Sequence, residues 1–373
     1  MRFGANCAAE QASALSDVLG PRVLVVTDAG LRRNGLPDAV LEALRQTAEV
    51  TVFDAVEADP SLATMRAAVG MASAADVTGV LGFGGGSPMD VAKATALCLG
   101  SDQPVDTMWG VDQASGPRVP LALVPTTAGT GSEVTPVAIL TVGAEEKRGI
   151  VSRHLLPDVA VLDPVLTVGL PADATAATGI DAMVHAIEAY TSRSANANPI
   201  SRMLAITALQ KLGGAIERAV TQADDLEARS EMLLGSMLAG QAFANSPVAA
   251  VHALAYPIGG MFHIPHGLSN ALVLTQVMRF NAPEATTAYA ALAPHVFPDI
   301  SGGGAQDMTV NFIEALEDMV RRLGLPPRLR DVGIGAEDLP KMAAEAMKQT
   351  RLLVNNPRPV RQADAQAIYE AAW

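Results

Sequence analysis

Five residues between positions 181 and 266 have the types and spacing of a metal-binding site. Asp181 and His185 are four positions apart in a helical pattern, so they share one face of that helix. His252, His263 and His266 follow together in one short stretch. The residues around Asp181 are apolar, and a buried carboxylate needs a partner such as a cation. We therefore predict one cation held by Asp181, His185, His252 and either His263 or His266.

The chemistry of this ligand set is that of a Lewis acid. Three neutral imidazoles and one carboxylate suit Zn²⁺ or Fe²⁺. With one coordination position open to substrate, such an ion would polarise the oxygen of an alcohol or a carbonyl compound. His154 and His295 have no such neighbours in the sequence, and we expect them to be structural or surface residues.

A glycine-rich turn in the first half of the chain, GFGGGSPMD, follows a predicted strand and precedes a predicted helix. Its glycines allow close backbone approach, and the N–H groups at a helix start bind anions. It is not a complete dinucleotide fingerprint, because Ser87 stands where the third glycine would be, and no Walker A lysine follows. We predict a phosphate-binding turn at Gly84, Gly85, Gly86 and Ser87, with Asp90 in the first helical turn; the alternative is an ordinary tight turn.

A second loop of small residues, PTTAGTGSEVT, follows another predicted strand. Its hydroxyl groups belong to Thr126, Thr127, Thr130 and Ser132. Two such loops at the carboxyl ends of neighbouring parallel strands would form a crevice, which is where open α/β sheets bind ligands. Together the two loops predict nucleotide binding.

Asp28 ends the predicted strand VLVVTD. A carboxylate there would accept hydrogen bonds from a ribose and repel the additional phosphate of NADP, so it favours NAD. The alternative is that Asp28 only caps a turn or a helix.

The elements that must position these residues differ between the two halves of the chain. The expected strands are 22–30, 49–56, 77–87 and 119–127, and the expected helices between them are 36–47, 61–75 and 88–100. This alternation indicates a mostly parallel sheet with helices on both faces. Beyond prolines 164 and 171 the expected elements are the helices 172–192, 199–219 and 225–245. The sequence predicts an α/β domain over 1–165 and an all-helical domain over 166–373.

The net charge and the residue composition of the chain exclude several classes of protein. The chain has 373 residues and a formal net charge of −13, without the basic stripe that a nucleic acid partner would require. Its two cysteines fit a reducing compartment, and neither a signal peptide nor a membrane span is visible. We expect a cytoplasmic protein.

Six segments in this order and spacing resemble the iron-containing (group III) alcohol dehydrogenase family over almost the whole length. The segments are GGGSPMD, PTTAGTGSE, GIDAMVHAIEAYTS, HALAYPIGG, HIPHGLSNA and NNPRP. The resemblance implies a Rossmann-like dinucleotide domain followed by an all-α domain, an architecture shared with dehydroquinate synthase. It also implies an active site in the cleft between the domains, a homodimer, and hydride transfer between NAD(H) and a small alcohol, aldehyde or ketone.

Matched position by position, the resemblance implies a role for each of the following residues. The metal ligands would be Asp181, His185, His252 and His266, which decides between His266 and His263. The pyrophosphate turn would be Gly84 to Ser87 with Asp90. The nicotinamide side would be lined by Thr126, Thr127, Thr130, Ser132 and Val134. Lys147 would contact the cofactor, Asp28 would favour NAD, and Val137 and Phe243 would line the substrate pocket.

Two positions depart from the family pattern. Tyr256 stands where many members have a second histidine that relays a proton, so Tyr256, His263 or water would serve here. The chain also starts near RFG, where most members carry a longer segment that often adds a strand across the dimer interface.

Four other functions compete with this reading. A maleylacetate reductase would use basic residues to hold its carboxylate substrate, and 241–270 contains no Lys or Arg. A lyase of the dehydroquinate synthase type would need several phosphate-binding cations near the metal. A glycerol dehydrogenase-like polyol oxidation shares the ligand set, and a noncatalytic nucleotide-binding protein would not need it.

Overall fold

The computed structural model describes residues 1–143 and 146–373. The chain divides into two compact units, the first formed by Met1–Thr127 and Gly131–Gly169 and the second by Ala128–Thr130 and Leu170–Trp373. The sequence placed a boundary between residues 165 and 166, whereas the main passage from the first unit to the second lies between Gly169 and Leu170.

The first unit is built around a six-stranded sheet in which every paired strand runs parallel to its neighbour. The strand order is β1 (Arg2–Phe3), β9 (Val159–Leu162), β6 (Leu121–Pro125), β4 (Gly79–Gly84), β2 (Arg22–Val26) and β3 (Glu49–Phe53). All residues of the central strands β4 and β6 are buried, as expected for a parallel sheet covered on both faces. The prediction of a mostly parallel sheet is confirmed.

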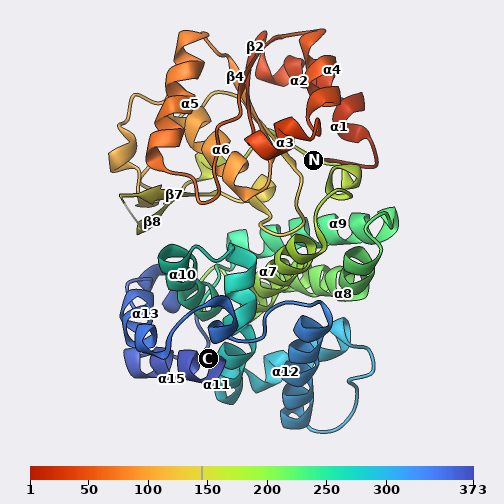
Figure 1. The fold of residues 1–373 in the computed structure, drawn as a ribbon, viewed down its shortest axis with the longest axis vertical. Coiled ribbons are helices and arrows are strands. Elements are labelled where there is room, and N and C mark those ends of the chain that lie inside the picture. Colours follow the sequence, from red (N-terminus) through yellow and green to blue (C-terminus); the bar gives the residue numbers. More distant parts are fainter. Residues whose placement is uncertain (144–145) are drawn as a thin grey trace. The chain divides into compact units, whose positions relative to one another are not determined.

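Helices cover both faces of this sheet, and Figure 1 shows them in two groups on either side of it. One group is α5 (Leu62–Ala74) and α6 (Gly86–Gly100), and the other is α1 (Cys7–Glu10), α2 (Ala12–Leu19) and α4 (Asp38–Arg45). Each group closes its own apolar cluster against the strands. A short helix, α3 (Ala29–Arg33), follows β2.

A small second sheet in the first unit was not anticipated. It has the order β5 (Gly110–Val111), β8 (Glu146–Val151), β7 (Val137–Val142). β7 and β8 form an antiparallel pair, and β5 adds in parallel to β8. Helix α6 packs against β7, so this sheet extends the apolar cluster around α6.

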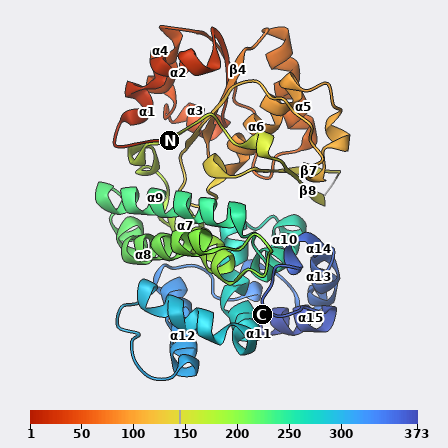
Figure 2. The same cartoon turned by 180° about the vertical axis from the view of Figure 1, so that it is seen from behind.

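The second unit is helical, as the sequence predicted, and is seen from two sides in Figures 1 and 2. Its helices are α7 (Ala172–Thr191), α8 (Pro199–Thr221), α9 (Leu226–Asn245), α10 (Ala250–Phe262), α11 (His266–Val296), α12 (Ala305–Arg322), α13 (Leu339–Ala346), α14 (Thr350–Leu353) and α15 (Gln362–Ala372). Helix α7 packs against α8, α9 and α11, and most of its residues are buried. No described helix is long and apolar enough to cross a membrane.

Glycines allow the helices around α7 to approach it closely. A Cβ atom on Gly267, in the first turn of α11, would lie 2.7 Å from the backbone carbon of Ala177. A Cβ atom on Gly179 would lie 2.6 Å from Met232 and 2.8 Å from Ile216, which belong to α9 and α8. Real Cβ atoms do not approach backbone atoms this closely, so position 267 requires glycine, whereas at position 179 the ends of two flexible side chains would have to move.

Candidate metal centre

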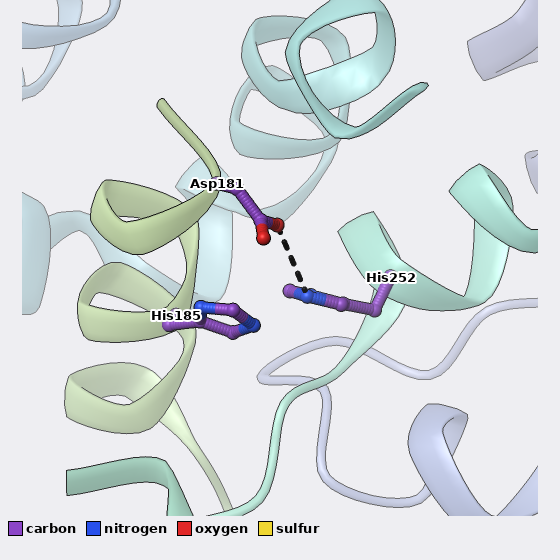
Figure 3. Close-up of side chains that lie close together, drawn as sticks. All are labelled: Asp181, His185 and His252. Atoms are coloured by element: carbon purple, nitrogen blue, oxygen red, sulfur yellow. Dashed lines mark ion pairs between the residues drawn. The ribbon is translucent and has the colours of Figure 1, made fainter. Parts of the chain in front are cut away.

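Three buried side chains from two helices converge in the second unit. Helix α7 carries Asp181 and His185, and α10 carries His252; their exposed fractions are 2%, 5% and 3%. One ligand atom from each lies within 4.8 Å of the other two. Figure 3 shows the carboxylate of Asp181 and the ring of His252 turned toward each other, with His185 beside them.

His266, the first residue of α11, reaches the same place. Its Nε2 is 3.7 Å from Asp181 Oδ1, the same distance as His252 Nε2 from that oxygen. The rings of His252 and His266 are 5.4 Å apart. The side chain of His266 is 35% exposed, so it forms the accessible side of the cluster. The structure therefore brings together all four side chains that the resemblance identified.

His263 has a different environment from these four residues. It ends α10 in the left-handed conformation, with φ 56°, and its backbone N–H donates to the carbonyl of Gly259. The residue is exposed. Its position at the bend between α10 and α11 explains its closeness in sequence to His266 without giving it the same surroundings.

Two aromatic side chains that the sequence singled out lie beside the cluster. The ring of Phe243, on α9, stacks on the ring of His185 with centroids 4.4 Å apart. The ring of Tyr256, on α10, lies 6.2 Å from the ring of His266.

Burial and mutual contact set the protonation of the group. Burial alone would raise the pKa of Asp181, but the imidazoles of His185, His266 and His252 and the amide of Asn270 lower it below its ordinary value. Burial lowers the pKa of His185 to about 3, against the opposing attraction of Asp181. At neutral pH the carboxylate is therefore ionised and this imidazole is neutral, which are the forms that bind metal ions.

The contacts of Asn270 show whether these four side chains fit a cation. This residue was not predicted from the sequence. Its amide Nδ2 lies 2.6 Å from Asp181 Oδ1 and 3.3 Å from Nε2 of both His252 and His266. One amide group has two hydrogens and cannot satisfy three acceptors, whereas a cation on which they converge can. The carbonyl oxygen of Asn270 is buried without a hydrogen-bond partner among the described residues. One carboxylate and three imidazoles fit a divalent ion with oxygen and nitrogen ligands.

The glycine turn that the sequence predicted to bind phosphate joins β4 to α6 in the first unit. Gly84 ends the strand with φ 150°, and a Cβ atom there would lie 2.7 Å from Pro88. Gly85 caps the helix, which begins at Gly86 and continues with Ser87. The N–H groups of Gly86 and Ser87 precede the first intrahelical carbonyl partner, as an anion site requires, and Pro88 has no N–H.

The second loop starts beside this turn. The backbone N–H of Thr126 donates to the carbonyl of Gly84 at 3.0 Å, so the two loops are adjacent where β4 and β6 end. Thr127 follows in the first unit, while Ala128, Gly129 and Thr130 cluster with the second unit.

Asp90 and Ser132 are bound to each other inside the first unit. Ser132 donates to Asp90 Oδ1 at 2.7 Å, and the backbone N–H of Ile139 donates to Asp90 Oδ2 at 2.9 Å. The buried Lys93 ammonium donates to Ser132 Oγ at 2.8 Å and to the carbonyls of Thr135 and Val137. These bonds hold the helix after the glycine turn to the end of the second loop and to β7.

The remaining predicted residues occupy four places. Asp28 caps α3, accepting the N–H of Leu31 at 2.9 Å. Lys147, on β8, forms an ion pair with Asp59 at 2.6 Å. Val134 lies in a short 3-10 turn (Ser132–Val134), and Val137 begins β7.

Comparison with known proteins relates both halves of the chain to one family. The family described as "Iron-containing alcohol dehydrogenase" matches residues 1–164, and "Fe-containing alcohol dehydrogenase family, C-terminal" matches residues 175–373. Long-chain-alcohol dehydrogenase 1 of Geobacillus thermodenitrificans is 41% identical over 356 residues, covering 94% of this chain and 89% of that protein.

Two crystal structures show the same likeness in three dimensions. That of a 1,3-propanediol oxidoreductase has a TM-score of 0.96 and 35% identity, covering 100% of this chain and 97% of that one. That of the sulfoacetaldehyde reductase from Bifidobacterium kashiwanohense in complex with NAD⁺ has a TM-score of 0.85 and 29% identity, covering 100% and 96%.

Proposed function

Because the chain belongs to the iron-containing alcohol dehydrogenase family, we propose that it transfers a hydride between NAD(H) and a small alcohol or its carbonyl partner at one divalent cation. The observation that carries this proposal is the convergence of Asp181, His185, His252 and His266 from three helices. The same four positions were identified from the sequence by the family resemblance.

The cation would be held by the three imidazoles and the carboxylate, and we propose Fe²⁺ or Zn²⁺ because both accept this donor set. When bound, it supplies Lewis-acid polarisation of the substrate oxygen. The chain contributes the arrangement: Asp181 remains ionised, His185 remains neutral, and their buried positions exclude water from two sides of the site. Tyr256 lies beside His266 and is our first choice for moving the substrate proton, with His263 or water as the alternatives.

We assign the nicotinamide cofactor to the first unit and the metal to the second. The glycine turn after β4 supports the first assignment, because the start of α6 directs the N–H groups of Gly86 and Ser87 out of the helix, where a pyrophosphate would bind. Asp28, two residues after β2, supports NAD over NADP, and the similar sulfoacetaldehyde reductase was crystallised with NAD⁺. Thr126, Thr127, Thr130, Ser132, Val134 and Lys147 remain proposed cofactor contacts, and Val137 and Phe243 remain proposed pocket residues.

The names of similar proteins support an alcohol or aldehyde substrate. They include a long-chain-alcohol dehydrogenase and a 1,3-propanediol oxidoreductase. We propose an aliphatic alcohol or aldehyde as the substrate class. We further propose a cytoplasmic homodimer, on the basis of the family resemblance and of two free cysteines, Cys7 and Cys98.

An absorbance assay of NADH tests the proposal. The protein is stripped with a chelator, reloaded anaerobically with Fe²⁺ or Zn²⁺, and offered a panel of aliphatic alcohols, diols, polyols, aldehydes and unsaturated keto acids. We expect no turnover without metal, restored turnover with one of the two ions, and a preference for alcohols and aldehydes over keto acids. Turnover that is insensitive to metal removal, or no turnover of any alcohol or aldehyde by metal-loaded protein, contradicts the proposal.

A further inference from the structure

Glu188 has no role in the proposed reaction so far, yet its carboxylate contacts the Nδ1 edge of His252 and the start of α10. It lies on α7, one turn beyond His185, and its side chain is 5% exposed. Its Oε2 lies 2.7 Å from His252 Nδ1 and accepts the backbone N–H of Ala249 at 2.9 Å. Its Oε1 accepts the N–H of Val251 at 2.7 Å. A buried carboxylate is thus surrounded by hydrogen-bond donors.

These contacts favour one position for the ring proton of His252. Both carboxylate oxygens accept backbone N–H groups, and a carboxylate has only acceptor sites, so we assign the hydrogen shared with His252 to Nδ1. A neutral imidazole that is protonated on Nδ1 has its lone pair on Nε2. That nitrogen is the one lying 3.7 Å from Asp181 Oδ1 and 3.3 Å from Asn270 Nδ2.

The same carboxylate holds the start of the helix that carries His252. Ala249 is the N-cap of α10 and has no side chain that can cap it. Glu188 takes the role by accepting the N–H groups of Ala249 and Val251, at the helix end where a negative charge is favoured. Two further bonds hold the preceding segment: Ser192 donates to the carbonyl of Pro247 at 2.9 Å, and Asn355 donates to that of Val248 at 3.0 Å.

We propose that Glu188 is a positioning residue that keeps the proton of His252 on Nδ1 and thereby directs the Nε2 lone pair at the cation; this inference rests on the proposed metal site. A carboxylate behind a ligating imidazole both orients the ring and makes it a better donor. Glu188 does not itself contact the substrate or the cation, because its oxygens face the opposite edge of the ring.

The direct test reads the tautomer in the metal-free protein. Long-range ¹H–¹⁵N correlation spectra of protein labelled with ¹⁵N-histidine distinguish Nδ1–H from Nε2–H, and the signals of His252 are assigned by their absence in His252→Gln. We expect Nδ1–H in the wild type and in Glu188→Gln, whose amide oxygen still accepts that proton. In Glu188→Met, which has no acceptor, we expect a shift toward Nε2–H. A wild-type His252 protonated on Nε2 overturns the proposal.

A chelator competition measurement of Zn²⁺ or Co²⁺ affinity gives the second readout. We expect Glu188→Met to bind the ion about 10–100-fold more weakly than the wild type, with Glu188→Gln in between. Ser192→Ala is the matched control, because it loosens the segment before α10 without touching His252, and we expect wild-type affinity. Equal affinity in Glu188→Met and Ser192→Ala overturns the proposal. If the wild type binds no ion, the proposed function fails, while the tautomer measurement still decides the role of Glu188.

Discussion

At the scale of single residues, His266 is the proposed ligand whose substitution should weaken metal binding with the least effect on folding. Its side chain is 35% exposed, whereas Asp181, His185 and His252 are buried, so truncation leaves no large internal cavity. We expect His266→Ala to keep the circular dichroism spectrum and melting temperature of the metal-free wild type but to lose tight metal binding and turnover. His295→Ala, on the same helix and bonded to the amide of Gln210, is the control and should retain both. Wild-type turnover in His266→Ala would show that its imidazole is not a ligand.

We expect the stability of the protein to depend on pH because of Glu133, a buried residue of the first unit. Burial raises the pKa of Glu133 to about 7, although the nearby Lys93 ammonium opposes this shift. Between pH 4.5 and 7 the folded state therefore keeps a proton that the unfolded state releases, so stability falls as pH rises through this range.

Substitution of Glu133 by glutamine should remove this dependence. Urea unfolding measures the free energy of unfolding at each pH. As the pH rises from 4.5 to 8, this free energy should fall in the wild type by up to about 3 kcal/mol relative to Glu133→Gln. Identical pH profiles for the two proteins would mean that Glu133 is not protonated in the fold.

The residues of the site differ in how far the sequence could identify them. Asp181 and His185 follow from their spacing on one helix, and the choice of His266 over His263 required the family resemblance. Asn270 lies one helical turn beyond His266, a spacing that could have identified it as a neighbour. Glu188 carried a weaker signal, a carboxylate in an apolar helix, because its partner His252 is 64 positions away and only tertiary packing joins them.

At the scale of elements, the contact between α7 and α11 holds ligands from two helices in register. Gly267 follows His266 directly, and a Cβ atom there would lie 2.7 Å from the backbone carbon of Ala177 and 3.2 Å from the backbone nitrogen of Thr178. We expect Gly267→Ala to push α11 away from α7, lowering stability by about 1–3 kcal/mol and weakening metal binding.

A glycine in an open position gives the control for this substitution. Gly214 lies exposed on α8, and nothing lies within 4 Å of a Cβ atom built on it. Gly214→Ala should stabilise the protein by up to about 1 kcal/mol, since alanine is the better helix former, and leave metal binding unchanged. Chemical unfolding and chelator competition measure both effects. If Gly267→Ala behaves like Gly214→Ala, the close contact of α7 and α11 is not needed.

The helices were easier to predict than the small sheet. The predicted helix 199–219 is α8 (Pro199–Thr221), whose start is marked by the Asn198 cap and the proline after it. β8 (Glu146–Val151), with the sequence EKRGIV, has too few apolar residues to show a strand periodicity. β7 (Val137–Val142) is a short apolar run that periodicity cannot distinguish from other buried segments.

At the scale of the whole molecule, the sequence indicated two parts but not the path of the chain between them. The segment Ala128–Thr130 interrupts the first unit and clusters with the second. A Cβ atom on Gly129 would lie 2.7 Å from Thr178 Cβ, so this short segment lies directly on α7. The sequence of the loop PTTAGTGSEVT does not predict this contact. The loop was assigned to the domain 1–165, and its contact residue Thr178 to the domain 166–373.

The central claim is that a single divalent ion is held by Asp181, His185, His252 and His266. Anomalous diffraction from crystals of the metal-loaded protein, recorded at the absorption edge of iron or zinc, tests it directly. The account predicts one strong peak, about 2.0–2.2 Å from a carboxylate oxygen of Asp181 and from one nitrogen of each imidazole. A peak at another place in the chain, or a fully loaded protein with no peak among these four side chains, would contradict it.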